Sequence, residues 1–188
     1  MKHIAIFASG SGTNAENIIK CFKNSKTVRV SLVLSNNPKA LVLERAAALE
    51  VKTVIFNKTQ LNDPQWGVEN LTDFDLIVLA GFLWKFPEHL LKTYKNKVVN
   101  VHPALLPKYG GKGMYGMHVH EAVVKNNELE TGITIHYVNE HYDEGAVVFQ
   151  AKCAVHKTDS TTEVAAKIHQ LEMEHFPKVI QNILLSDV

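Results

Sequence analysis

The sequence predicts an α/β protein built on a single doubly wound, mostly parallel sheet. Short apolar, β-branched runs alternate with amphipathic stretches through residues 1–100, which is the pattern of a Rossmann-like half. Some of these runs are apolar at every position, as buried strands covered by helices on both faces are. Two longer β-rich runs follow residue 130, so we expect extra strands at the C-terminal end.

The elements follow one another in a regular order. The expected strands span residues 4–8, 28–34, 51–56, 76–80, 98–101, 132–138 and 146–155, and the expected helices span 13–23, 41–49 and 161–185. The first helix carries its apolar residues on one face. Pro177 should kink or divide the last helix. Residues 103–115 are dense in Pro and Gly and predict a loop. We expect one domain over residues 1–188.

Composition excludes several classes of protein. The chain has 188 residues, 46% of them hydrophobic, and its 20 basic side chains nearly balance its 19 acidic ones. That balance favours neither nucleic acid nor a membrane surface as a partner. The longest apolar run, residues 76–84, is far shorter than the ~20 residues of a membrane span. Cys21 and Cys153 match no disulfide or metal spacing, so we expect free thiols in the cytoplasm.

The first motif is a glycine-rich turn between the first strand and the first helix, Gly10-Ser11-Gly12-Thr13-Asn14. Such a turn, followed by a helix N-terminus with unpaired N–H groups, can hold a phosphate. The alternative is a tight turn in which Ser11 or Thr13 caps the helix. A dinucleotide site is disfavoured, because the second strand ends in Ser-Asn-Asn without the acidic residue that the fingerprint requires.

The second motif is Asn100-Val101-His102-Pro103 at the end of an apolar strand. Residues two apart in a strand share a face, and the carboxyl ends of parallel strands line the ligand crevice. An Asn amide can donate to a developing oxyanion, and a His can exchange a proton near neutral pH. The alternative for this motif alone is a pair of polar side chains at a strand end that are hydrogen-bonded within the protein and have no catalytic role.

The third region is the acidic loop of residues 139–145, which in isolation is most simply a solvated turn. In the strand before it, Thr134 and His136 share one face, where a His is more often a core or supporting residue than a catalyst. His118 and His120 could suggest a metal site. A helix prefers metal ligands four positions apart, and we expect Val119, Ala122 and Val123 to form the buried stripe. We therefore expect no metal.

Taken together, these segments resemble the phosphoribosylglycinamide formyltransferases, a family of formyltetrahydrofolate-dependent enzymes. Residues 10–14 resemble the family's phosphate loop, and residues 79–83 its folate-lining strand end. Residues 100–109, Asn-Val-His-Pro-Ala-Leu-Leu-Pro-Lys-Tyr, resemble its central signature, and residues 143–145 its catalytic aspartate loop. The resemblance runs in one order over nearly the whole chain.

The resemblance implies transfer of the formyl group of 10-formyltetrahydrofolate to the amine of glycinamide ribonucleotide, in de novo purine (IMP) biosynthesis. Residues 1–100 would hold the phosphate, and residues 101–188 the catalytic and folate sites. Asn100 would bond the formyl oxygen, His102 would act as general acid, and Asp143 would orient His102 and relay the amine proton. The two substrates would be the only partners, with no metal and no nucleic acid, and the protein would be a monomer or weak homodimer.

The resemblance also assigns binding residues. Those implied for the ribonucleotide and its phosphate are Gly10, Ser11, Gly12, Thr13, Asn14 and Glu172. Those implied for the folate are Leu83, Trp84, Lys85, Phe86, Val138, Asn139, Glu140, His141 and Tyr142. Thr134 and His136 would support the catalytic residues. The sequence departs from the family in a longer glycine loop at residues 110–116 and in a shorter segment at residues 57–72, where the basic residue that usually grips the phosphate has no evident counterpart.

Alternatives remain within and outside this chemistry. Methionyl-tRNA formyltransferase has an additional C-terminal domain, formyltetrahydrofolate deformylase usually has an N-terminal regulatory domain, and sugar-amine formyltransferases usually lack the phosphate loop; we expect none of these here. A non-catalytic nucleotide-binding module would explain the glycine loop. It would not assign a common role to Asn100, His102 and Asp143.

Overall fold

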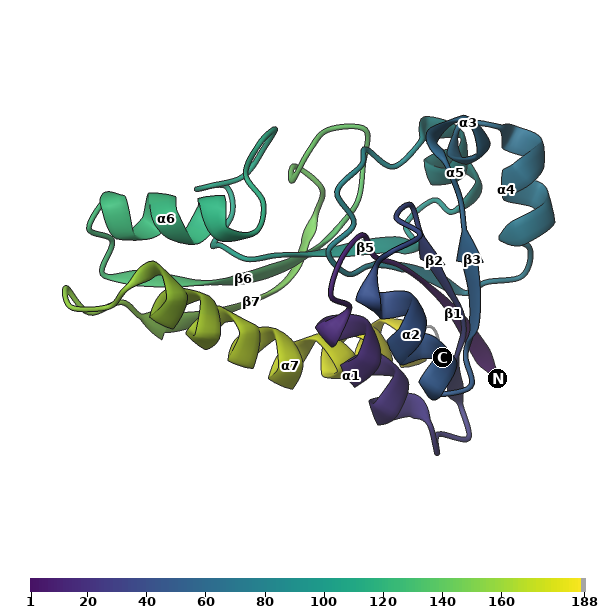
Figure 1. The fold of residues 1–188 in the computed structure, drawn as a ribbon, viewed down its shortest axis with the longest axis horizontal. Coiled ribbons are helices and arrows are strands. Elements are labelled where there is room, and N and C mark those ends of the chain that lie inside the picture. Colours follow the sequence, from purple (N-terminus) through teal and green to yellow (C-terminus); the bar gives the residue numbers. More distant parts are fainter. Residues whose placement is uncertain (187–188) are drawn as a thin grey trace.

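Seven strands form one sheet in the order β3-β2-β1-β4-β5-β6-β7. The first five are parallel, and β6 and β7 are antiparallel to their neighbours. The computed structural model describes residues 1–186 (Figure 1). The strands are β1 (Lys2–Phe7), β2 (Val28–Ser35), β3 (Lys52–Ile55), β4 (Leu76–Leu79), β5 (Val98–His102), β6 (Glu130–Tyr137) and β7 (Val147–Ala154). The predicted mostly parallel sheet with extra C-terminal strands is confirmed.

Helices cover both faces of the sheet. They are α1 (Thr13–Phe22), α2 (Leu41–Ala48), α3 (Lys58–Leu61), α4 (Pro64–Asn70), α5 (Glu88–Thr93), α6 (Met117–Lys125) and α7 (Thr161–Leu185). α1, α2 and α7 pack together on one face, and α3, α4 and α5 gather on the other (Figure 1). α6 packs against α7. Among residues 1–186, no helix is long and apolar enough to cross a membrane.

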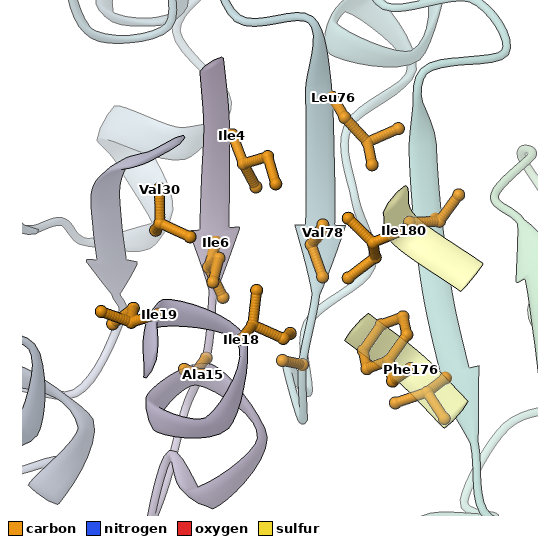
Figure 2. Close-up of a cluster of buried hydrophobic side chains, with 14 of the residues drawn as sticks. Ile4, Ile6, Ala15, Ile18, Ile19, Val30, Leu76, Val78, Phe176 and Ile180 are labelled. Carbon is orange, nitrogen blue, oxygen red and sulfur yellow. The ribbon is translucent and has the colours of Figure 1, made fainter. Parts of the chain in front are cut away.

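The parallel strands are apolar on both faces because each face has its own core. Along β1, Ile4 and Ile6 point into the core shared with α1 and α7, whereas Ala5 and Phe7 point into the core shared with α3, α4 and α5. Figure 2 shows the first of these cores, in which Ile18 of α1 and Phe176 of α7 lie over β1 and β4. Alternation of side chains along a strand produces this division.

Pro177 does not divide α7, which runs unbroken over 25 residues. Proline at this position removes the N–H that would bond the carbonyl of Met173, four residues earlier. That carbonyl instead accepts a hydrogen bond of 2.8 Å from the Asn17 side chain of α1. The expected break is therefore avoided by a partner on the neighbouring helix, and Pro177 itself is buried.

The strand order reverses beside β1. The chain moves outward from β1 through β2 to β3, then returns to place β4 on the other side of β1. Ligands of such sheets bind outside the carboxyl ends of the strands at this switch point. Here the carboxyl ends of β1, β4 and β5 lead into the glycine loop, the segment of residues 80–87 and the Asn100–His102 motif, so the fold brings the predicted motifs together.

Candidate functional site

A cavity of about 910 Å³ lies at the carboxyl ends of β1, β4 and β5. It is lined by the glycine loop, by the segment after β4, by the end of β5 and by the loop after β6. α7 contributes Ile168, His169 and Glu172 to one wall, and α6 contributes Met117 and His120. Both halves of the chain therefore form one cavity.

Asn100 and His102 stand together at the end of β5, as their spacing predicted. The antiparallel pairing of β5 with β6 sets Asn100 opposite His136, and His102 opposite Thr134. The Thr134 hydroxyl donates to the carbonyl of Ala104 at 2.7 Å and accepts from the N–H of Leu106 at 3.0 Å. Thr134 thus fixes the chain just after His102, while His136 contacts the Asn100 side chain.

The tautomer of His102 follows from its contacts. Its Nε2 lies 2.7 Å from the backbone carbonyl oxygen of Tyr109, and because a carbonyl can only accept, Nε2 carries a hydrogen. The other nitrogen, Nδ1, lies 3.5 Å from Oδ2 of Asp143. Nδ1 is therefore the nitrogen that gains and loses a proton, and it does so facing a carboxylate.

His136 fixes the orientation of the Asn100 amide by the same reasoning. His136 Nδ1 lies 2.8 Å from the carbonyl oxygen of Tyr137, to which it donates. In the neutral ring Nε2 is then an acceptor, and it lies 3.1 Å from Asn100 Nδ2. One N–H of the amide is used in this bond, and the second is left to donate to a ligand.

Asp143 lies between the two imidazoles. Its Oδ2 accepts a 2.9 Å hydrogen bond from the N–H of Gly111, and its Oδ1 lies 3.6 Å from His136 Nε2. The backbone at Asp143 has φ 58°, a left-handed conformation that Asp tolerates better than most residues. Nearby, a Cβ at Gly145 would lie 1.7 Å from the carbonyl oxygen of Tyr137, so only glycine lets this loop fold back against β6.

The electrostatics favour an ionised Asp143 beside a neutral His102. Burial lowers the pKa of His102, and although the Asp143 carboxylate and the Tyr109 carbonyl raise it, the pKa stays below its ordinary value. Burial raises the pKa of Asp143, but its contacts with His136 and His102 and the hydrogen bond from the Gly111 N–H outweigh that effect and leave the pKa below its usual range. The pair can accept a proton near neutral pH.

The glycine loop forms the opposite end of the cavity. Gly12 is the N-cap of α1, and no side chain caps the helix, so the alternative with Ser11 or Thr13 as a cap is excluded. The first helical hydrogen bond runs from Glu16 N to Gly12 O, which leaves the N–H groups of residues 13–15 without helical partners. This loop, Gly10 to Asn14, lines the cavity.

Gly12 is required by packing as well as by conformation. It has φ 73°, and a Cβ there would lie 2.4 Å from Cβ of Val42 in α2. A Cβ at Gly10, in contrast, would meet no atom within 4 Å. The first glycine is therefore open toward the cavity, and the second holds α1 against α2.

Glu172 joins the glycine loop to α7. Its Oε2 accepts a 2.9 Å hydrogen bond from Asn14 Nδ2 and lies 3.6 Å from His169 Nδ1. The hydrogen bond with Glu172 raises the pKa of His169 above its ordinary value. Asn14 Oδ1 is buried without a hydrogen-bond partner, so this end of the cavity holds unmet polar groups.

The residues expected at the folate form the outer wall, with one exception. Eight of the nine line the cavity: Leu83, Trp84, Lys85, Phe86, Val138, Asn139, His141 and Tyr142. The ninth, Glu140, does not; its side chain is 62% exposed, because the loop turns it toward solvent. Ser9 ties this wall to the glycine loop, since its hydroxyl accepts from the N–H of Leu83 and donates to Asn36.

Sequence reasoning missed the contribution of α6. His118 and His120 do face apart, but His120 is buried and lines the cavity, while Ala122, expected in the buried stripe, is only half-buried. His169 and Lys112 were also missed. The helical spacing of His120 relative to Val123 was the signal. Within residues 1–186, no three His, Cys, Asp or Glu side chains are grouped as metal ligands would be.

Comparison with known proteins agrees with this architecture. A family model described as "Formyl transferase" matches residues 2–180. The phosphoribosylglycinamide formyltransferases of Haemophilus influenzae and Bacillus subtilis are 34% and 32% identical to this chain; their alignments cover 96% and 98% of it, and 86% and 95% of the relatives. The crystal structure of phosphoribosylglycinamide formyltransferase from Anaplasma phagocytophilum superposes with a TM-score of 0.88 at 30% identity, over 98% of this chain and 88% of that one. By sequence and by fold, this chain belongs to the formyl transferase family.

Proposed function

We propose that this enzyme transfers the formyl group of 10-formyltetrahydrofolate to the amine of glycinamide ribonucleotide, in purine biosynthesis. The relatives named above carry that activity in their names. The observation that supports it most is a single cavity that holds an uncapped helix N-terminus together with Asn100, His102 and Asp143. A phosphate and a reacting amine on one molecule would occupy both.

In this proposal the acceptor amine attacks the formyl carbon and gives a tetrahedral intermediate with a negative oxygen. The free N–H of Asn100 donates to that oxygen, and His136 holds the amide in the donating orientation. A donor that is already oriented stabilises the developing charge without reorganisation. Collapse of the intermediate releases the folate nitrogen, which takes up a proton.

The proton of the attacking amine passes to the pair of His102 and Asp143. The nitrogen that titrates, Nδ1 of His102, faces Asp143 Oδ2, so a proton taken up there is stabilised by a carboxylate at once. The same nitrogen can return the proton to the departing folate nitrogen. The lowered pKa of His102 in the free enzyme suits a group that must first accept a proton.

The acceptor's phosphate lies on α1. The N–H groups of residues 13–15 have no helical partners and are available to donate to it, and the helix dipole favours its charge. Glu172 accepts from the ribose hydroxyls, and His169, with its raised pKa, adds positive charge beside the glycine loop. The pterin lies against Leu83 and the loop of residues 138–143.

The test is an absorbance assay of the folate product with three acceptors. The proposal predicts rapid formyl release with glycinamide ribonucleotide and little with an amino sugar nucleotide or with water alone. Equally rapid release with water would instead identify a deformylase.

A further inference from the structure

The turn of residues 109–111 holds both members of the His102–Asp143 pair. The carbonyl oxygen of Tyr109 accepts from Nε2 of His102 at 2.7 Å, and the N–H of Gly111 donates to Oδ2 of Asp143 at 2.9 Å. Between them, a Cβ at Gly110 would lie 3.3 Å from Cβ of Asp143, so the turn packs closely against the aspartate. Contacts that fix this turn therefore also fix the imidazole and the carboxylate relative to each other.

The backbone of the turn does not impose its own conformation. Tyr109 has φ 56°, a left-handed conformation that is unfavourable for a residue with a Cβ. Gly110 and Gly111 follow, and glycine adopts many backbone conformations at little steric cost. A strained residue beside two glycines keeps one conformation only when the surrounding structure imposes it. The direction of the Tyr109 carbonyl is therefore set by contacts outside the turn.

The side chain of Tyr109 makes those contacts away from the cavity. Its ring packs against the small core of Val123, Val155 and Val164, and its hydroxyl donates to Oε1 of Glu128 at 2.8 Å. Burial and this bond raise the pKa of Tyr109, so the hydroxyl keeps its proton. Glu128 is itself held, because its N–H donates to the carbonyl of Val123 in the last turn of α6. The hydrogen bond thus ties the turn to α6.

We infer that Glu128 is a positioning residue for the reaction: through the Tyr109 hydroxyl it fixes the turn that holds His102 and Asp143. The bond at Nε2 keeps a hydrogen on that nitrogen and leaves Nδ1 of His102 free to accept a proton. If the turn loosens, the ring can adopt the other tautomer, in which Nδ1 is already protonated. The inference rests on the proposed function, in which His102 takes up the proton of the attacking amine.

A bond that only stabilises the fold makes a different prediction. Lys108 also pairs with Glu128, at 3.0 Å, and its side chain is exposed; exposed ion pairs contribute little to stability. Loss of such a contact would lower the melting temperature slightly and leave His102 unchanged. A positioning role instead lowers kcat and changes the tautomer of His102. It leaves both KM values nearly unchanged, because neither Tyr109 nor Glu128 lines the cavity.

Five variants of the full-length enzyme separate these roles. Tyr109→Phe keeps the ring and removes the hydroxyl, and Glu128→Ala removes its acceptor. Glu128→Gln keeps an oxygen that can accept from the hydroxyl. The fourth variant combines Tyr109→Phe with Glu128→Ala. Glu130→Ala is the matched control, because Glu130 is two residues away and pairs instead with Lys152 of β7, at 2.8 Å.

The measurements are chosen so that a structural role and a positioning role give different results. For each variant, kcat and the KM of both substrates are determined, together with a melting curve. Nitrogen NMR of His102 in the free enzyme, at a pH where the ring is neutral, reports its tautomer without depending on turnover.

We expect Tyr109→Phe and Glu128→Ala each to lower kcat about tenfold, because small misplacements of a reacting group are costly. His102 should change from the Nε2–H tautomer alone to a mixture of both. The double variant should be no slower than the slower single variant, since both changes remove the same bond. Glu128→Gln should recover most of kcat.

Two results would overturn the inference. One is an equal kcat in Glu128→Ala and Glu130→Ala, and the other is a lowered kcat with His102 still entirely in the Nε2–H tautomer. Absence of turnover with glycinamide ribonucleotide in the unsubstituted enzyme would instead refute the proposed function, and the NMR comparison would still test the link from Glu128 to His102.

Discussion

The two ends of the cavity differ in how their polar groups are satisfied. At the Asn100–His102–Asp143 end, the side chains bond to one another and to the backbone carbonyls of Tyr109 and Tyr137. At the glycine-loop end, the N–H groups of residues 13–15 are uncapped, and Asn14 Oδ1 is buried without a partner. The first end is largely hydrogen-bonded without a ligand, and the second is largely not.

This difference separates turnover from affinity. A preorganised set of donors acts on charge that develops only in the transition state, so damage there should lower kcat. Uncapped N–H groups gain partners when the substrate binds, so damage at the glycine-loop end should raise KM. The variants below test that division.

The largest effect is expected at the preorganised end. Asn100→Ala, His102→Ala and Asp143→Asn should each lower kcat at least about a hundredfold, with folate affinity little changed. Asn is chosen at position 143 because it tolerates the left-handed backbone there. Steady-state kinetics and folate titration provide the measurements.

The three residues form one cluster, in which His102 Nδ1 lies 3.5 Å from Asp143 Oδ2, and this arrangement sets a control and a second expectation. Combining the changes at His102 and Asp143 should cost much less than the product of the single losses. Glu144 is the next residue, and its side chain is exposed and lies outside the cavity. Glu144→Ala should therefore leave kcat nearly unchanged. If Glu144→Ala were inactive while Asp143→Asn stayed active, the proton relay would belong to Glu144 instead.

A smaller effect on activity is expected at the glycine loop. Gly10→Ala adds a methyl group where no protein atom lies within 4 Å, so the fold should be unchanged and the acceptor KM should rise roughly tenfold. Gly12→Ala instead meets Val42 and keeps a left-handed backbone, and should cost about 2–5 kcal/mol of unfolding free energy. Chemical denaturation distinguishes the two; equal stability losses would contradict the assignment.

The smallest expected effect is a shift in the pKa of His102. Asp143 raises the pKa of His102 against the effect of burial. Asp143→Asn removes that contribution, so the NMR titration midpoint of His102 should move to lower pH, whereas Glu144→Gln should leave it unchanged. A midpoint that moves to higher pH in Asp143→Asn would show that the carboxylate does not stabilise the imidazolium.

The sequence predicted what depends on local periodicity and strand ends. All seven strands and three of the helices were predicted within about two residues, and Asn100, His102 and Asp143 do lie together. The helices of residues 58–70 were not predicted, although Asn57 and Gln60 form a capping box and Asp63 precedes Pro64 at the start of a helix. Those signals are short and have no long amphipathic stretch to support them.

What could not be predicted depends on contacts between distant segments. Where α7 continues past Pro177, the carbonyl of Met173 bonds the side chain of Asn17 on another helix, and the Asn100 amide bonds His136, 36 residues away. Burial of His120 depends on the packing of α6 against α7. The balance of burial against the Asp143 charge at His102 likewise arises only in the folded protein.

The central claim is that one acceptor spans both ends of the cavity, with its phosphate on α1 and its amine beside Asn100, His102 and Asp143. The most direct measurement compares initial rates for glycinamide ribonucleotide and for the same compound without its phosphate. Hydrogen bonds to a charged group are strong, so we predict a KM at least about a hundredfold higher for the dephosphorylated acceptor with kcat changed only a few-fold. Equal KM values for the two acceptors would contradict the account.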